Sequence, residues 1–208
     1  MIKLTLDGST TLYSQYFDQY YHSIFGAKTE SEKVFIKLGL HYALEMFNDI
    51  NILEMGLGTG LNVLLTLESC NERERKIDYT GIEAHPLMEE SLKELSFDSS
   101  IFHIAGWESW NQISPFLNFI KHHVSLEEYN TTNKYNLVYY DAFAPSSQPE
   151  LWTQPIFEKV ASLMTTGGIL VTYCSKSYVQ RNLRAAGFIV EKHPGPPRKR
   201  EVLRAILK

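Results

Sequence analysis

The chain has 208 residues, of which 44% are hydrophobic and 21% charged, which is enough for one globular domain with a full core. No apolar run approaches the length that spans a bilayer, and the N-terminus lacks the apolar stretch of a secretory signal, so we expect a cytoplasmic protein without a membrane partner. Two cysteines make no disulfide framework, and the seven histidines show no metal-ligand spacing, so no metal is expected.

The net charge of −4 is unevenly distributed. From residue 176 to the end there are nine Lys and Arg residues against two Glu residues, so this stretch is basic and the remainder acidic. A basic end on an acidic body suggests an anionic partner such as nucleic acid, and the alternative is a solvated surface with a chance imbalance.

The first 48 residues differ in pattern from the rest. Residues 3–14 alternate apolar and polar around Asp7-Gly8, which predicts a hairpin. Residues 13–25 are dense in aromatics, and the apolar spacing from Thr29 onward is helical. We therefore expect residues 1–48 to form an N-terminal extension packed on a main domain that comprises residues 49–208.

Strand and helix signals alternate from residue 50 onward. Seven segments have the apolar composition of strands: 50–55, 77–82, 101–104, 136–140, 167–174, 188–192 and 202–207. Helix signals lie between them: 61–68, a helix opened by Pro86, 107–122 with an interruption at Pro115, 155–163, and a helix that ends at Ala186. This alternation predicts an α/β fold with a doubly wound, mostly parallel sheet, which binds ligands at the carboxyl ends of its strands.

One predicted strand ends abruptly on an acid. Residues 137–140 are apolar or aromatic, Asp141 follows, and Pro145 and Pro149 then exclude a helix and stiffen the loop. The position of Asp141 at a strand's carboxyl end makes it a candidate functional residue.

A glycine-rich turn follows the first strand of the alternation. Glu54 precedes Gly56, Gly58 and Gly60, whose lack of side chains permits a tight turn and close approach of a ligand. Leu61 occupies the position where a dinucleotide-binding loop needs a small residue, and no Gly-Lys-Ser/Thr follows, which argues against that loop and against a P-loop.

The Glu-x-Gly-x-Gly-x-Gly pattern resembles the first motif of the class I S-adenosylmethionine-dependent methyltransferases. The resemblance implies a seven-stranded Rossmann-like sheet and S-adenosylmethionine as cofactor, with Glu54, Gly56, Gly58, Thr59 and Gly60 in its site. It also implies an acid after the next strand that binds the ribose hydroxyls, a position held by Glu83, since a carboxylate accepts bonds from two vicinal hydroxyls. The alternatives are a strand-end charge for Glu54 and an exposed loop acid for Glu83.

Four stretches make the resemblance more specific. They are DAFAPSSQPELWT (141–153), the Gly56–Asn62 loop, GPPRKREVL (195–203), and an N-terminal pattern made by Phe17, Asp18, Tyr21, Glu30, Val34 and Phe35. Together they resemble, in order and over nearly the whole chain, the motifs of the tRNA 5-aminomethyluridine methyltransferases. There are departures: Gly106 is followed by Trp107 and Glu108 where the family's third strand usually ends Gly-Asp to meet the adenine, and Pro196-Pro197 replace Phe-Gly.

The resemblance implies methyl transfer to the amine of 5-aminomethyl-(2-thio)uridine at the wobble position, giving the methylaminomethyl form, with the anticodon region of tRNA as partner. Family members are often fused to a flavin-dependent oxidase. This chain looks like the methyltransferase half alone, so the oxidase is expected as a separate protein.

The resemblance and the chemistry together assign roles to single residues. An ordinary aspartate pKa near 3.9 makes Asp141 a weak base, so its expected role is to accept a hydrogen bond from the amine and orient it. Phe143 and Trp152 are expected to stack on the unstacked base beside Pro145, with core packing as the alternative for either aromatic residue. The residues expected to bind phosphates are Lys176, Arg181, Arg184, Arg198, Lys199 and Arg200, with a solvated surface as the alternative.

Two other functions remain open at this stage. A methyltransferase or aminopropyltransferase acting on a small amine would explain the glycine loop and Asp141, but not the basic end. A non-catalytic RNA-binding subunit of the same fold would explain the basic end, but not three retained acids.

Overall fold

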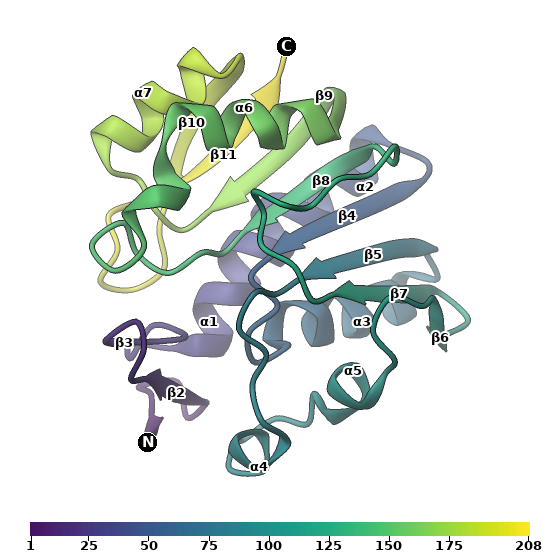
Figure 1. The fold of residues 1–208 in the computed structure, drawn as a ribbon, viewed down its shortest axis with the longest axis vertical. Coiled ribbons are helices and arrows are strands. Elements are labelled where there is room, and N and C mark those ends of the chain that lie inside the picture. Colours follow the sequence, from purple (N-terminus) through teal and green to yellow (C-terminus); the bar gives the residue numbers. More distant parts are fainter.

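The computed structural model describes residues 1–208 and contains one large sheet covered by helices on both faces, with a small three-stranded sheet beside it (Figure 1). The large sheet has eight strands in the order β10-β11-β9-β8-β4-β5-β7-β6. Five strands are parallel: β4 (Ile50–Met55), β5 (Ile77–Ile82), β7 (Leu117–His122), β8 (Tyr135–Tyr140) and β9 (Met164–Thr172). Three antiparallel strands complete it: β6 (Asn111–Ser114), β10 (Phe188–Pro194) and β11 (Glu201–Leu207). The mostly parallel α/β fold is confirmed.

Each face of the sheet is covered by its own helices and has its own hydrophobic core. One face packs against α6 (Gln154–Leu163) and α7 (Ser177–Ala185). The other packs against α3 (Leu61–Arg73) and against a continuous helical segment made of α1 (Ala27–Ser31), η1 (Glu32–His41) and α2 (Tyr42–Met46). This two-sided burial explains why the central strands are apolar along their whole length. None of the helices combines the length and the apolar composition needed to cross a bilayer.

The N-terminal hairpin and helix occur as predicted. Strands β1 (Ile2–Leu4) and β2 (Thr10–Ser14) pair antiparallel, and β3 (Gln19–Tyr20) adds a third strand. The following helical segment lies within the main core, since Val34 and Leu40 are fully buried against the sheet. The helix therefore packs as part of the main domain. The division of the chain at residue 48 stays a prediction.

The segment between β5 and β8 differs from the sequence-based expectation. Residues 101–104 belong to a helix, α5 (Ser100–Ile104), and not to a strand. Residues 107–122, predicted as an interrupted helix, form the β6–β7 hairpin, and Pro115 lies in its turn. Burial of β7 beside β5 outweighs the helical spacing, and β6 becomes an eighth strand beyond the seven expected.

The helix expected to open at Pro86 begins three residues later. The short α4 covers Glu89–Leu92, and Pro86 lies in the loop after β5. That loop turns back on itself, because the backbone N–H of His85 donates to the Glu83 carboxylate at 2.8 Å. Pro86 is therefore part of this loop and does not start the helix.

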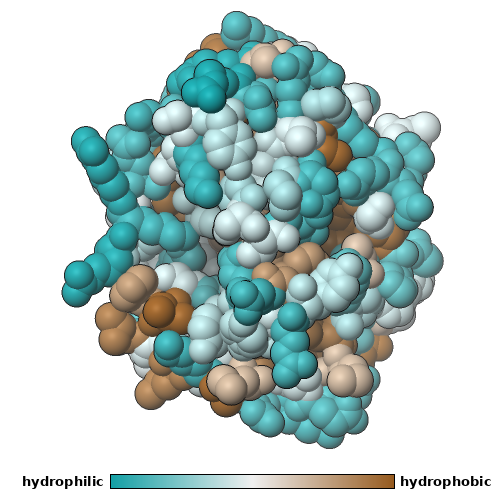
Figure 2. All heavy atoms as spheres, turned by 60° about the vertical axis from the view of Figure 1, so that its left-hand side comes forward, coloured by the Kyte–Doolittle hydropathy of each residue, from teal (hydrophilic) through white to brown (hydrophobic).

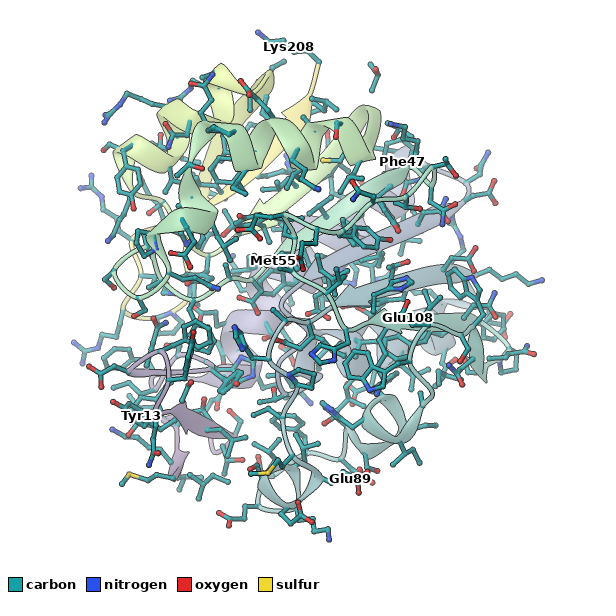
Figure 3. All side chains as sticks on the ribbon, viewed as in Figure 1. Tyr13, Phe47, Met55, Glu89, Glu108 and Lys208 are labelled. Carbon is teal, nitrogen blue, oxygen red and sulfur yellow. The ribbon has the colours of Figure 1, made fainter.

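Backbone hydrogen bonds continue beyond the strands and bring three loops together. The N–H of Gly56 donates to Ile82 at 3.1 Å, and the N–H of Asp141 donates to Met55 at 3.2 Å. Figure 3 shows Met55, the last residue of β4, near the middle of the molecule. The glycine loop, the Glu83 loop and the Asp141 loop thus start side by side at one edge of the sheet.

Candidate active site

A cavity of about 570 Å³ opens at this edge of the sheet. The ends of β4 and β5 and the residues after β8 line it on one side, and the N-terminal segment 17–25, the segment 124–127, Arg198 and Lys199 form part of its walls. The volume lies in the range that holds small-molecule ligands and cofactors.

The glycine loop supplies a wall of bare backbone. Gly56, Gly58 and Gly60 all have positive φ, at 88°, 51° and 76°. A Cβ on Gly56 would stand 3.1 Å from the carbonyl oxygen of Asp141, and one on Gly58 would stand 3.1 Å from the ring of Tyr21. Side chains at these positions would therefore strain the loop and narrow the cavity. Gly60 begins α3 and faces His103 and not the cavity.

Glu83 joins two of the loops. Its Oε2 accepts a bond from the N–H of Gly58 at 2.8 Å, and its Oε1 accepts one from His85. Each oxygen retains a further acceptor position, so the carboxylate is fixed in place and still able to accept bonds from a ligand.

The N-terminal segment covers the glycine loop. His22 Nε2 and Thr59 Oγ1 are 2.6 Å apart, and burial lowers the pKa of His22 to about 4, so its imidazole is neutral. The ring of Phe17 stacks on Phe143 with centroids 4.2 Å apart. The aromatic segment therefore encloses the cavity from the side opposite the sheet.

Asp141 is held by a chain of side-chain hydrogen bonds. The amide nitrogen of Asn62 donates both to Asp141 Oδ2 and to Glu54 Oε1, each at 2.9 Å. The Tyr79 hydroxyl donates to the other oxygen of Glu54 at 2.8 Å. Glu54 is 1% exposed and does not line the cavity, and its hydrogen-bond partners are protein groups, so the contact of its carboxylate with the cofactor stays a prediction.

The environment of Asp141 changes its acidity. Burial raises the pKa of Asp141 to about 7, against the opposing effect of the bond from Asn62. The Glu30 carboxylate also raises this pKa, and the Lys199 ammonium lowers it. Burial also raises the pKa of Glu54 well above its usual range. The expectation of a weakly basic Asp141 with an ordinary pKa is therefore wrong.

The loop after Asp141 divides its aromatic residues between cavity and core. Phe143 lines the cavity, but one of its faces is taken by Phe17. Trp152 is fully buried, and its indole N–H donates to the carbonyl of Phe143 at 2.9 Å. Pro145 is buried outside the cavity. Both residues pack in the protein beside the Phe143 loop, and the predicted contacts of Trp152 and Pro145 with the base stay predictions.

The basic residues of the C-terminal third do not form one uniform surface. Lys199 pairs with Glu30 and lies 4.1 Å above the Tyr173 ring, so its charge is already partnered, and its predicted phosphate contact stays a prediction. Arg198 is exposed at the cavity wall. Arg200, Lys176 and Arg181 are exposed and lie off the cavity, as does Arg184.

Hydrophobic side chains gather on another part of the surface. Figure 2 shows them at the lower left of a mostly hydrophilic face, where the N-terminal sheet of Figure 1 comes forward. Leu4 and Leu6 of this region are 68% and 76% exposed.

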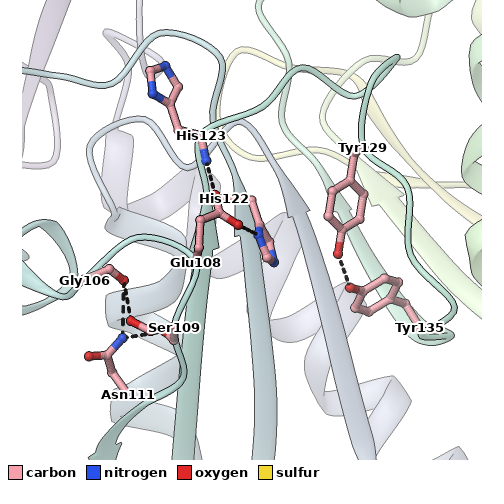
Figure 4. Close-up of polar contacts among 8 residues, drawn as sticks. All are labelled: Gly106, Glu108, Ser109, Asn111, His122, His123, Tyr129 and Tyr135. Atoms are coloured by element: carbon pink, nitrogen blue, oxygen red, sulfur yellow. Dashed lines mark hydrogen bonds and ion pairs between the residues drawn. The ribbon is translucent and has the colours of Figure 1, made fainter.

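Glu108 lies away from the cavity. It is bonded to His122 at the end of β7 and accepts from the N–H of His123 at 3.1 Å (Figure 4). The strand beside β5 thus ends at His122, and the segment 124–127 that follows it lines the cavity. The alignment of Gly106, Trp107 and Glu108 with a third strand's end is therefore wrong.

The cavity unites part of the predicted site and adds residues that sequence reasoning missed. Predicted residues on it are Gly56, Gly58, Thr59, Glu83, Asp141, Phe143, Arg198 and Lys199. Missed residues on it include Gln19, Tyr21, His22, Glu30, Asn62 and Tyr173. Three of the missed residues, Tyr21, Glu30 and Asn62, lie in the motifs that carried the family resemblance, and this was the signal available.

These features fit S-adenosylmethionine: a glycine-rich loop, a carboxylate after the next strand and a cavity of suitable size. A family model described as S-adenosyl-L-methionine-dependent methyltransferase matches residues 113–208. The protein is a class I methyltransferase whose cofactor is S-adenosylmethionine.

Similar proteins narrow this class. The chain is 33% identical, over 96% of its length, to a protein of Leptospira interrogans named tRNA 5-methylaminomethyl-2-thiouridine biosynthesis bifunctional protein MnmC, and 29% identical, over 95%, to the protein of that name from Cupriavidus metallidurans. It spans about a third of each relative, 34% and 32%. The crystal structure of MNMC2 from Aquifex aeolicus superposes with a TM-score of 0.82 at 27% identity, covering 100% of this chain and 70% of that one. The chain belongs to the MnmC methyltransferase family, as its motifs predicted.

Proposed function

We propose that the protein methylates the primary amine of 5-aminomethyluridine, or of its 2-thio form, at the wobble position of tRNA. The observation that carries the proposal is Asp141, a carboxylate that shares one cavity with the glycine loop and has a pKa of about 7. The name of the Leptospira and Cupriavidus relatives, which places them in the biosynthesis of the methylaminomethyl nucleoside in tRNA, supports the choice of substrate.

The acidity of Asp141 suits an amine nucleophile. An alkylamine titrates near 10, as lysine does, so it arrives mostly protonated and must lose a proton before it can attack. S-adenosylmethionine supplies an electrophilic methyl group on a sulfonium. The amine nitrogen forms a bond to that methyl carbon as the carbon–sulfur bond breaks, and the amine proton passes to Asp141 and then to solvent. A base with a pKa near 7 serves this transfer better than an ordinary aspartate.

Other residues of the cavity take supporting roles. The backbone of Gly56 and Gly58 lies against the cofactor, and the free acceptor positions of Glu83 bind its ribose hydroxyls. The segment 124–127 after β7 holds the adenine end, in place of Glu108. Phe143 offers its remaining exposed surface to the unstacked base.

The basic surface next to the cavity serves the tRNA backbone. Arg198 lies at the cavity wall, and Arg200 is exposed nearby in sequence. Their guanidinium groups suit phosphate contacts, which position a nucleic acid without specifying its sequence.

The proposal is tested with tRNA that carries the aminomethyl precursor, with putrescine and spermidine as small-amine controls. Single-turnover methylation is expected for the tRNA and not for the polyamines. The rate should rise with pH through about 7, because Asp141 accepts the proton only when ionised, and should fall about tenfold per unit below that pH. Equal methylation of polyamines, or cofactor binding without transfer to either substrate, would contradict the proposal.

A further inference from the structure

We infer that Asn62 is a positioning residue that orients the Asp141 carboxylate, and that Glu54 contributes to the reaction through Asn62 and not through the cofactor. The inference rests on the role of Asp141 proposed above. It concerns the protein alone, so it can be tested without substrate or cofactor.

The amide group of Asn62 links two acids. Asn62 is the second residue of α3 and is 2% exposed. Its nitrogen carries two hydrogens, and both are used, one toward Glu54 Oε1 and one toward Asp141 Oδ2. This is the one side-chain hydrogen bond that Asp141 accepts, so Asn62 is the one hydrogen-bond donor among side chains that orients its carboxylate.

The two acids fix the orientation of the Asn62 amide. The reverse orientation would place its oxygen against the oxygens of Glu54 and Asp141 and would leave its nitrogen on the side where Oδ1 finds no hydrogen-bond partner. In the observed orientation, Asn62 Oδ1 is buried and has no hydrogen-bond partner. An unsatisfied buried acceptor costs free energy that an apolar residue would avoid. A residue that served only to pack the start of α3 would not need this arrangement.

Glu54 is the anchor of the link. It is buried on β4, lies off the cavity, and accepts from Tyr79 of β5 on its second oxygen. The hydrogen-bonded chain thus runs from Tyr79 through Glu54 and Asn62 to Asp141, across β5, β4, α3 and the end of β8. With both ends attached to the central sheet, the chain holds the Asp141 carboxylate in one place before any ligand binds.

The charges around Asp141 decide which way its pKa responds when Asn62 is changed. The ionisable groups that face this network are Glu30, Glu54, Tyr79, Glu83, Tyr173 and Lys199. Burial and Glu30 raise the pKa of Asp141, whereas Lys199 and the bond from Asn62 lower it. Loss of the hydrogen bond from Asn62 should therefore raise the pKa of Asp141 further.

The test is Asn62→Leu, which keeps similar volume but donates no hydrogen bond. Aspartate labelled with ¹³C at its carboxyl carbon is titrated by NMR in the cofactor-free protein, and the Asp141 signal is assigned as the one absent from Asp141→Asn. The pKa of Asp141 should rise by about one unit or more, the effect of losing a hydrogen bond to a charged group. The acidic limb of the single-turnover rate should move up in pH by the same amount.

The matched control is Thr66→Val, one turn further along α3. Thr66 bonds to the Asn62 carbonyl at 2.8 Å and to the Tyr139 hydroxyl at 3.2 Å, but it does not line the cavity. It should lower the melting temperature without moving the Asp141 titration. If Asn62→Leu does not fold, Asn62→Ser removes the same amide and carries the same expectation.

The outcomes separate this inference from the proposed function. An unchanged Asp141 titration in folded Asn62→Leu, or an equal shift in Thr66→Val, overturns the positioning role. A shifted titration in a protein that methylates no tRNA supports the positioning role and contradicts the proposed substrate.

Discussion

The two ends of the cavity are built by different means. At the cofactor end, backbone does the shaping: Gly56 and Gly58 follow β4 with positive φ, and the N–H of Gly58 donates to Glu83. At the amine end, side chains do it, since Asp141 depends on Asn62, Glu30 and Lys199 from three other parts of the chain. The cofactor end is built from one loop and the next strand, which are close in sequence. The amine end is built from residues that are far apart in sequence.

This difference predicts where a single substitution has the greatest effect. We expect Asp141→Ala to lose at least about 100-fold in single-turnover rate, the usual contribution of a positioned base, with little change in cofactor affinity. Asp141→Asn keeps an acceptor for Asn62 but removes the base, so its loss should approach that of alanine. A rate near that of the original protein in either variant would mean that the amine end does not depend on this carboxylate.

A substitution at the cofactor end should weaken cofactor binding, and should not lower the rate of methyl transfer when the cofactor is saturating. Gly58→Val adds a branched side chain where φ is 51° and where a Cβ already meets Tyr21, so affinity for S-adenosylhomocysteine should fall at least tenfold. Isothermal calorimetry measures this. Gly8→Ala is the matched control, because Gly8 also has positive φ but nothing within 4 Å of an added Cβ. Equal affinities in folded Gly58→Val and Gly8→Ala would remove the glycine loop from the site.

The same difference explains how much the sequence could predict. The glycine loop, Glu83 and Asp141 were found because strand ends and motif spacing are local features. The pairing of Lys199 with Glu30 was missed because 169 positions of chain separate the two residues, and a basic run gives no sign that one member is paired with an acid.

Local pattern also failed where tertiary contacts decide. Residues 107–122 were predicted as an interrupted helix, but within them β7 pairs with β5, and β6 pairs with β7. Trp152 was ambiguous for a similar reason. An aromatic residue in a functional loop can contact a ligand or support the loop, and here the bond from its indole N–H to Phe143 accompanies full burial.

A third prediction separates the cavity wall from the amine end. The pair Arg198→Ser and Arg200→Ser should weaken tRNA binding several-fold and lower the slope of log affinity against log salt by about 0.7–0.9 per lost phosphate contact. Lys199→Met should leave that slope unchanged, because Lys199 is paired with Glu30. Filter binding over a salt series measures both. A slope lowered equally by Lys199→Met would show that the ion pair opens to the tRNA.

The smallest expected effect is on stability, and it tests the burial of Asp141 without any reaction. A carboxyl group whose pKa rises from 3.8 to about 7 on folding binds more protons in the folded state between these values. Its presence therefore lowers stability progressively as pH rises from about 4 to about 7, and by a constant amount above that. Asp141→Asn has no such dependence and should keep the bond from Asn62.

The melting temperature of Asp141→Asn should thus match that of the original protein near pH 4 and exceed it by a margin that grows as pH rises to about 7 and is constant above that. Thermal unfolding followed by circular dichroism over this pH range measures the difference. Asp78→Asn on β5 is the control, since the exposed Asp78 carboxylate accepts one side-chain hydrogen bond, from Asn118 at 2.8 Å. Its melting temperature should not rise relative to that of the original protein as the pH increases. An advantage for Asp141→Asn that stays constant with pH would mean that Asp141 is ionised throughout, and the amine end would then act by orientation and charge and not by accepting a proton.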